Sequence, residues 1–167
     1  KSWGNAIEFD EAAERMGADV MRWMFTKARP EENINFGWHA ADEARRELLV
    51  LWNVYSFFVT YARLAGWSPD GSTSAGLAGG TVLDRWIGSR AAATAEIARD
   101  RLADYDAVGA TRAISTFNDD LSTWYLRLSR KRFSRNDDGR RSSSMSARRS
   151  AGLLERIMPI LPCSMIA

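Results

Sequence analysis

The sequence predicts an all-α protein, an antiparallel helix bundle preceded by a short helical segment, and three observations support this prediction. The 167 residues include 46% hydrophobic and 26% charged residues, which is the composition of a globular domain. Apolar side chains recur at three- and four-residue spacing in several long stretches, as they do on the buried face of a helix. No window alternates apolar and polar residues over more than a few positions, so a strand is hard to place anywhere.

Two short helices are expected near the N-terminus. Residues 10–16 form the first, and Gly17 ends it because glycine is common just after a helix. Asp19 stands where either an N-cap or a first-turn carboxylate would open a second helix over residues 20–27, which ends before Pro30. The pair should form a compact helix-turn-helix unit.

A long amphipathic helix is predicted over residues 42–65, followed by a glycine-rich surface loop over residues 66–80. The apolar positions of this helix follow the three-four spacing of a broad buried stripe. They are Leu48, Leu51, Trp52, Tyr55, Phe58, Val59 and Ala62.

Two further helices follow, separated by a turn at Asp104 and Asp106. The first starts at Thr81, and its less regular stripe consists of Val82, Leu83, Trp86, Ile87, Ile97 and Leu102. The second has the clearest seam, formed by Ala110, Ile114, Phe117, Leu121, Trp124 and Leu128. Such a seam packs against antiparallel neighbours at a shallow angle.

The net charge of +2 is unevenly distributed along the chain. Residues 1–70 carry 8 basic and 11 acidic side chains, residues 71–126 carry 5 and 7, and residues 127–167 carry 10 and 3. A polyanion is therefore attracted only to the last quarter of the sequence.

Several classes of protein are disfavoured. No stretch of about 18 apolar residues lacks a charge, which argues against a membrane span. Cys163 is the only cysteine and His39 the only histidine, so we expect no disulfide and no metal site, with His39 exposed near a helix start. We expect a cytosolic protein without a secretory signal. Because the first residue is Lys1, we also expect the chain to be a piece of a longer one.

Two clusters of residues carry candidate chemistry. Lys1 begins a short segment with Ser2, Gly4 and Asn5, and a mobile lysine on such a loop is suited to meet triphosphate oxygens. The alternative is a frayed, solvated terminus.

The second cluster is basic and lies at the end of the last predicted helix. Arg127, Arg130 and Lys131 share one helix face, beside Arg132, Arg135 and the rings of Trp124 and Tyr125. Guanidinium groups next to aromatic rings suit unpaired RNA bases. The alternatives are that these cations complement the helix dipole and that Trp124 lies on the buried seam.

A family resemblance ties these segments together. Residues 1–5 match the last five positions of the Lys-Met-Ser-Lys-Ser-x-Gly-Asn loop of class I aminoacyl-tRNA synthetases of the Ile/Val/Leu/Met group. Further blocks in family order are GADVMRW (17–23), NINFG (33–37), LWNVYSFF (51–58), LDRWI (83–87) and WYLRLSRKRF (124–133). Within the group, the sequence most closely resembles the isoleucyl family, chiefly in residues 55–61 and 124–133.

The resemblance implies a division of roles. Residues 1–38 would end the catalytic domain, with Lys1 as the catalytic residue that stabilises departure of pyrophosphate, and with Ser2 and Asn5 shaping the ATP loop. Residues 39–167 would form the anticodon-binding bundle, which would contact tRNA(Ile) through Trp124, Arg127, Arg130, Lys131 and Arg132. ATP, with Mg²⁺, and isoleucine would bind only to the full enzyme, a cytoplasmic monomer, so this segment alone would bind no cofactor and be inactive.

Two alternatives remain at this stage. One is a segment of a valyl- or leucyl-tRNA synthetase, and the other is a free-standing helical module that binds RNA or protein. The match also decays after Phe133, where residues 136–150 are rich in arginine and serine and lack an apolar face. Because Pro159-Ile160-Leu161-Pro162 again resembles the family, we hypothesise that residues 139–150 arise from a shifted reading frame.

Overall fold

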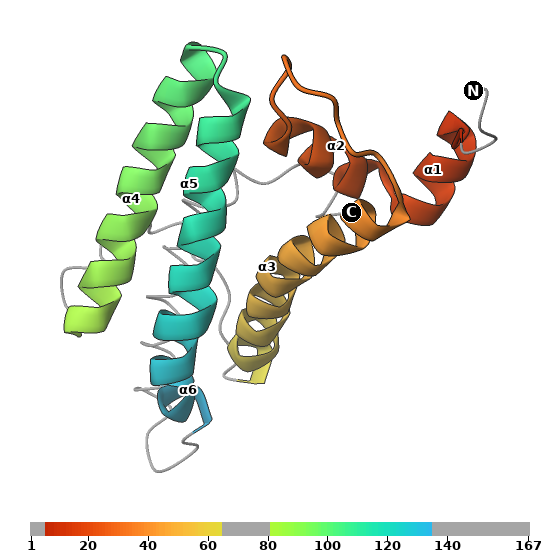
Figure 1. Ribbon diagram of the computed structural model, residues 1–167. Helices are drawn as coiled ribbons and strands as arrows, with labels where there is room; N and C mark the ends of the chain where they lie inside the picture. Colours follow the sequence, from red (N-terminus) through yellow and green to blue (C-terminus); the bar gives the residue numbers. More distant parts are fainter. Residues whose placement is uncertain (1–5, 65–80, 135–167) are drawn as a thin grey trace.

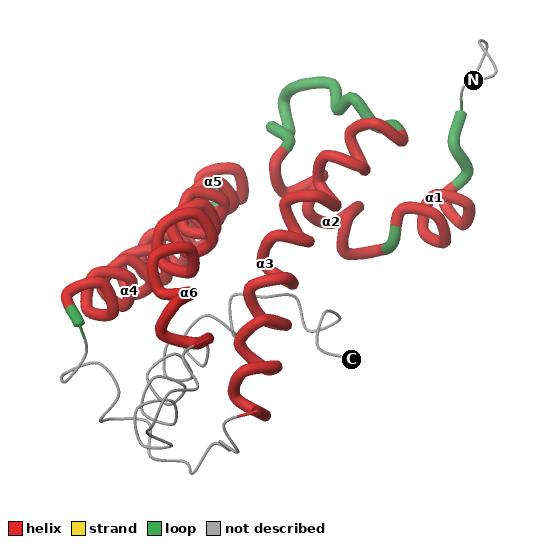
Figure 2. Tube along the Cα trace, turned by 90° about the horizontal axis from the view of Figure 1, so that it is seen from below, coloured by secondary structure: helices red, strands yellow, loops and turns green. Residues whose placement is uncertain are grey.

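The computed structural model describes residues 6–64 and 81–134, and within these ranges every regular element is a helix. In chain order they are α1 (Phe9–Met16), α2 (Ala18–Lys27), α3 (Trp38–Leu64), α4 (Val82–Ala103), α5 (Ala107–Asp119), the π-helix η1 (Asp120–Leu126) and α6 (Arg127–Ser134). The prediction of an all-α bundle is confirmed. In both views α4 and α5 lie together on one side of α3, and α1 lies on the other (Figure 1, Figure 2).

The α1–α2 unit forms as predicted. Gly17 joins the two helices with φ 88° and ψ 141°, a conformation that favours glycine because it has no Cβ. Gly17 also occupies the N-cap position, so Asp19 lies in the first turn of α2, the second of its two expected roles. There its carboxylate accepts a hydrogen bond from Arg22 at 2.9 Å.

Helix α3 begins at Trp38, four residues earlier than expected, and contributes to two separate cores. Its first half packs with α1 and α2 around Ala12, Met16, Val20, Met21, Met24, Ala41, Ala44 and Leu48. Its second half packs with α4, α5 and η1 around Leu51, Val54, Ile87, Ala91, Phe117, Leu121 and Tyr125. The predicted stripe is correct at Leu48, Leu51 and Ala62, but Trp52 is exposed and Val54 is buried in its place.

Half of the predicted stripe of α4 is correct, because Ile87 is buried and Leu83 and Trp86 pack against the same core. Val82, Ile97 and Leu102 are exposed, whereas Gly88, Ala91, Thr94 and Ala98 are buried together with Asp84 and Ile87. Small side chains line this face because α4 packs closely against α5, where Ala110 and Thr111 are also small and buried. Val82, Ile97 and Leu102 therefore lie off this contact.

A tight corner joins α4 to α5 at the predicted turn. Tyr105 has φ 60° and is 94% exposed, and the Asp106 side chain caps α5 by accepting a hydrogen bond from the Gly109 amide at 2.8 Å. A Cβ on Gly109 would lie 2.2 Å from an oxygen of that carboxylate, so a larger residue here would require the Asp106 side chain to shift from its capping position.

The seam of the last helix is correct only as far as Leu121. Beyond it, Trp124 and Leu128 are 60% and 59% exposed, while Tyr125 and Ser129 are buried. The cause is η1, because a π-helical turn contains more residues than an α-helical turn and shifts all later side chains around the axis. α5, η1 and α6 nevertheless follow one another without an intervening loop (Figure 1).

Other predictions fall outside the described residues. They concern Lys1, Ser2, Asn5, the loop over 66–80, Arg135, Cys163 and the segment 136–150. In the part of the chain that the structure describes, none of the helices has the length and apolar character needed to cross a membrane.

Candidate nucleic-acid interface

The η1–α6 segment has two chemically distinct faces. One face is directed into the bundle and carries Tyr125 and Ser129, both buried. The other is exposed along successive turns, at Trp124, Arg127, Leu128, Arg130 and Lys131. The exposed face therefore places a large aromatic ring beside three cations.

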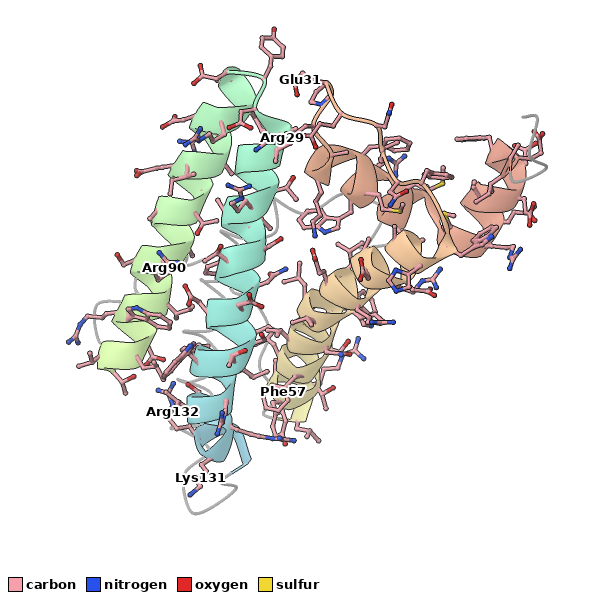
Figure 3. The ribbon with its side chains drawn as sticks, viewed as in Figure 1. Arg29, Glu31, Phe57, Arg90, Lys131 and Arg132 are labelled. Atoms are coloured by element: carbon pink, nitrogen blue, oxygen red, sulfur yellow. The ribbon has the colours of Figure 1, made fainter. Side chains whose placement is uncertain are left out.

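Arg127 and Arg130 are available for a ligand. Both side chains are exposed, and neither forms a hydrogen bond or an ion pair with any other described residue. Lys131 is exposed near the end of the same helix, where it projects away from the bundle (Figure 3). These three cations lie three and four residues apart, so they point to one side.

Arg132 has a different environment. Its guanidinium group lies on the side of α6 that faces α4 (Figure 3), where Nη1 donates to Asp84 Oδ2 at 3.0 Å and Nη2 donates to Asp84 Oδ1 at 2.8 Å. Nη2 also donates to the Ser129 hydroxyl at 2.7 Å, and Nη1 to the Thr81 hydroxyl at 3.3 Å. The structure thus separates Arg132 from the other predicted site residues.

Asp84 is the centre of this polar network. Its side chain is 3% exposed, and it accepts hydrogen bonds from the Tyr125 hydroxyl at 3.0 Å and from the backbone and side chain of Thr81, both at 2.8 Å. Thr81 and Asp84 form the capping box that begins α4. One carboxylate therefore joins the start of α4 to both η1 and α6.

The charge of this carboxylate is stabilised by its partners. Burial alone would raise the pKa of Asp84, but the hydrogen bonds from Arg132 and Thr81 outweigh burial and hold that pKa well below its usual range. The hydrogen bond with Asp84 in turn raises the pKa of Arg132. The pair is consequently ionised at all physiological pH values.

A second ion pair fixes the start of η1. Arg90 of α4 contacts Asp120 Oδ2 through both Nε and Nη2, each at 2.7 Å. The pair is only partly buried, so it contributes less than the Asp84 network. The two ion pairs attach both ends of the η1–α6 segment to α4.

The opposite end of the bundle holds a wide, open cavity. Its volume is about 1010 Å³, and it lies between the α2–α3 connection and the α4–α5 corner, lined by residues that include Phe25, Ile97 and Arg112. Acidic and basic side chains both line it, and some of them are paired, Arg101 with Asp106 at 3.0 Å and Arg29 with Glu32 at 3.4 Å. It therefore lacks the excess of positive charge found on α6.

No group of three or more metal-binding side chains occurs among residues 6–64 and 81–134. His39 lies in the first turn of α3 with an exposed side chain, 3.9 Å from Glu43.

Sequence reasoning missed Asp84, Ser129 and the inward position of Tyr125. A signal for Asp84 was present, because Thr81 precedes it by three residues, the spacing of a capping box. No pattern in the sequence predicted the π-helical turn that directs Tyr125 and Ser129 towards it.

Comparison with known proteins identifies relatives of this region. Residues 84–164 match the family described as the anticodon-binding domain of tRNA ligase. The chain is 39% identical over 136 residues to the isoleucine–tRNA ligase of Porphyromonas gingivalis and 40% identical over 135 residues to that of Deinococcus radiodurans, covering 80% of this chain in each case. It is 37% identical to that of Dehalococcoides mccartyi over an alignment of 167 positions that covers 97% of this chain.

These relatives are much longer than the chain. It spans 12% of the Porphyromonas and Deinococcus ligases and 16% of the Dehalococcoides ligase. The match to the anticodon-binding family begins at Asp84 and therefore includes the whole η1–α6 segment.

Proposed function

The chain carries the anticodon-binding region of a class I aminoacyl-tRNA synthetase, and on that premise we propose that it is part of an isoleucine–tRNA ligase whose η1–α6 segment binds tRNA(Ile). The complete enzyme would activate isoleucine with ATP and transfer it to this tRNA. The similarity to the isoleucine–tRNA ligases over most of the chain favours this enzyme over a valyl- or leucyl-tRNA synthetase or a free-standing module.

One observation carries the assignment of the tRNA-binding surface. The exposed face of η1 and α6 places the Trp124 ring beside Arg127, Arg130 and Lys131. Arginine and lysine bind phosphates and fix the position of the RNA, whereas an exposed indole stacks on an unpaired base. An anticodon stem and loop offers both kinds of group.

The remaining roles follow from the proposed enzyme. Residues 1–38 would end the catalytic domain, and Lys1, Ser2 and Asn5 would contact ATP, whose phosphates Mg²⁺ accompanies in this class. Residues from 39 onward would serve the tRNA. The ligase would be a cytosolic monomer, and this segment alone would not activate isoleucine.

The experiment is a charge reversal, Arg130→Glu, in the intact ligase. We expect weaker tRNA binding and a smaller dependence of log Kd on log salt, by about one ion pair, because each phosphate contact contributes a slope of about 0.7–0.9. Isoleucine-dependent pyrophosphate exchange should not change. The control is Arg99→Glu, the same charge change at an exposed position near the far end of α4, which should bind tRNA almost normally. Equal effects of the two variants would remove α6 from the site.

A second variant tests the ATP side. Lys1→Ala should slow isoleucine-dependent pyrophosphate exchange and leave tRNA affinity unchanged, because the removed ammonium group would meet the triphosphate. Exchange that depends on valine or leucine in the parent enzyme would contradict the isoleucine assignment, and exchange by the 167-residue chain alone would contradict its inactivity.

A further inference from the structure

We infer that Asp84 is a positioning residue for tRNA binding, which acts by holding Arg132 and thereby setting the direction in which α6 presents Arg127 and Arg130. On this inference Arg132 does not contact RNA, although it lies within the basic cluster. The inference rests on the proposed function, because it concerns how the same surface is held.

The donors of Arg132 support this role. Both terminal nitrogens already donate hydrogen bonds within the protein, to Asp84, Ser129 and Thr81. A phosphate or a guanine is recognised by the same paired N–H groups. Arg132 could bind RNA in this way only by leaving a buried carboxylate without its counter-ion, which is costly.

The packing of α6 shows why such a link is needed. Of residues 127–132 only Ser129 is buried, and Leu128 is exposed, so no large apolar side chain in this stretch fixes the rotation of the helix. The contacts that the structure describes for residues 127–132 are polar, and the nearest apolar contact is that of Leu126, which precedes α6 and packs against the core. Tyr125 and Arg132 bind Asp84 directly, and Ser129 binds Arg132.

The geometry relates this link to the RNA-facing residues. The side of the η1–α6 segment that faces α4 carries Tyr125, Ser129 and Arg132 on successive turns. The opposite side carries Arg127 and Arg130. One residue of an α-helix corresponds to about 100° of rotation, so even a partial turn of α6 would redirect both arginines. Asp84 therefore influences phosphate contacts that it does not make.

The test is a double-mutant cycle in the intact ligase with Asp84→Asn and Arg132→Gln. Each single variant should weaken tRNA binding about tenfold, and the double variant should bind no worse than either one, because both changes remove the same link. If Arg132 instead contacted a phosphate, Arg132→Gln would weaken tRNA binding equally in the parent and in the Asp84→Asn background. It would also lower the salt slope by about 0.7–0.9 in both backgrounds. That additive result would overturn the inference.

Two readouts separate positioning from general destabilisation. Pyrophosphate exchange should be normal in both single variants. Their salt slopes should fall, because Arg127 and Arg130 no longer meet the phosphates together, whereas a variant that only unfolds more readily keeps the parental slope in its folded fraction. A parental slope in Asp84→Asn would refute the inference. The matched control is Glu96→Gln, an exposed carboxylate on the same helix, which should change neither quantity.

Tyr125→Phe provides a milder variant if Asp84→Asn fails to fold. It removes one hydrogen bond to Asp84 and keeps the ring in the core, so tRNA affinity should fall by a few-fold with normal exchange. Parental affinity in both Tyr125→Phe and Arg132→Gln would overturn the inference. Failure of Arg130→Glu to affect tRNA binding would instead overturn the proposed function.

Discussion

The two cores that share α3 are constructed differently. The core around α1 and α2 consists mainly of methionine and alanine, and its polar link, Glu47, lies at the rim with its side chain 37% exposed. The core around α4, α5 and η1 contains Ile87, Phe117 and Leu121, and its polar link, Asp84, is buried. Methionine adapts to irregular gaps, whereas a buried ion pair requires one arrangement. The comparison teaches that orientation is most strictly defined beside the cationic helix.

The polar links of Glu47 and Asp84 also differ in strength, because the two carboxylates differ in burial. Glu47 accepts a hydrogen bond from Trp23 at 2.8 Å and another from Lys27. Burial raises the pKa of Glu47, but the hydrogen bonds from Lys27 and Trp23 outweigh burial, so this pKa lies below its usual value. Water reaches this carboxylate and screens its interaction with Lys27.

The largest effect is expected for Asp84→Ala, which leaves Arg132 without its partner. The free energy of unfolding of the 167-residue chain should fall by about 1.5–3 kcal/mol, the range for hydrogen bonds to a charged group, because the Arg132 side chain is 33% exposed and water can partly solvate its charge once Asp84 is removed. Urea unfolding followed by circular dichroism measures it. Asp100→Ala, an exposed carboxylate on the same helix, should stay within about 0.5 kcal/mol of the parent. Similar losses in the two variants would contradict the assignment of Asp84.

A backbone change should affect the other core. Gly17→Ala forces a Cβ into a conformation with positive φ, so we expect a loss of about 1–3 kcal/mol in the same unfolding experiment. Gly37→Ala is the matched control, because Gly37 lacks a positive φ and a Cβ there would meet no atom within 4 Å. A greater loss at Gly37 would show that the α1–α2 joint tolerates a side chain.

Acid should weaken the link made by Asp84. The pKa of Asp84 is lowered on folding, so its contribution is complete above the unfolded pKa, near 4, and is lost as the pH falls towards the folded pKa. Between pH 4 and pH 3 this amounts to at most about 1.4 kcal/mol for one group. The loss over that interval should be smaller in Asp84→Asn than in the parent chain. Identical pH profiles would show that Asp84 is not preferentially ionised in the fold.

The smallest effect is expected for Glu47→Gln. An amide oxygen can still accept the hydrogen bond from Trp23, and only the partly exposed pairing with Lys27 is lost, so the stability should change by less than about 1 kcal/mol. The thermal midpoint provides the measurement. A loss as large as that of Asp84→Ala would remove the distinction between the two links.

Local patterns predicted the helices well because periodicity and stop signals act over a few residues. Gly17, Pro30 and the Asp104–Asp106 turn were sufficient to separate α1, α2, α4 and α5. The buried faces were harder to predict. In α4 the contact is made by small residues such as Gly88 and Ala91, which carry little hydrophobic signal even though they permit the closest approach.

The candidate site was predicted in composition but not in arrangement. The basic cluster was evident from Arg127, Arg130 and Lys131, and the resemblance gave it a role. The structure adds that Trp124 is exposed and that Arg132 faces Asp84, both of which depend on the π-helical turn. That turn directs Tyr125 to Asp84, a hydrogen-bond partner 41 residues away in sequence, and local patterns carry no signal for such a contact.

The close packing of α4 on α5 makes the pair a rigid spacer of fixed length. At about 1.5 Å per residue, the 22 residues of α4 extend roughly 33 Å from the Asp84 network to the Tyr105 corner, next to the end of α5 where Thr111 meets Thr26 of α2. Helices that touch through glycine, alanine and threonine leave little room to slide or bend. The spacing between the cationic helix and the N-terminal unit is therefore set by the length of one rigid element, and inserting a single turn into both helices would lengthen it by about 5.4 Å.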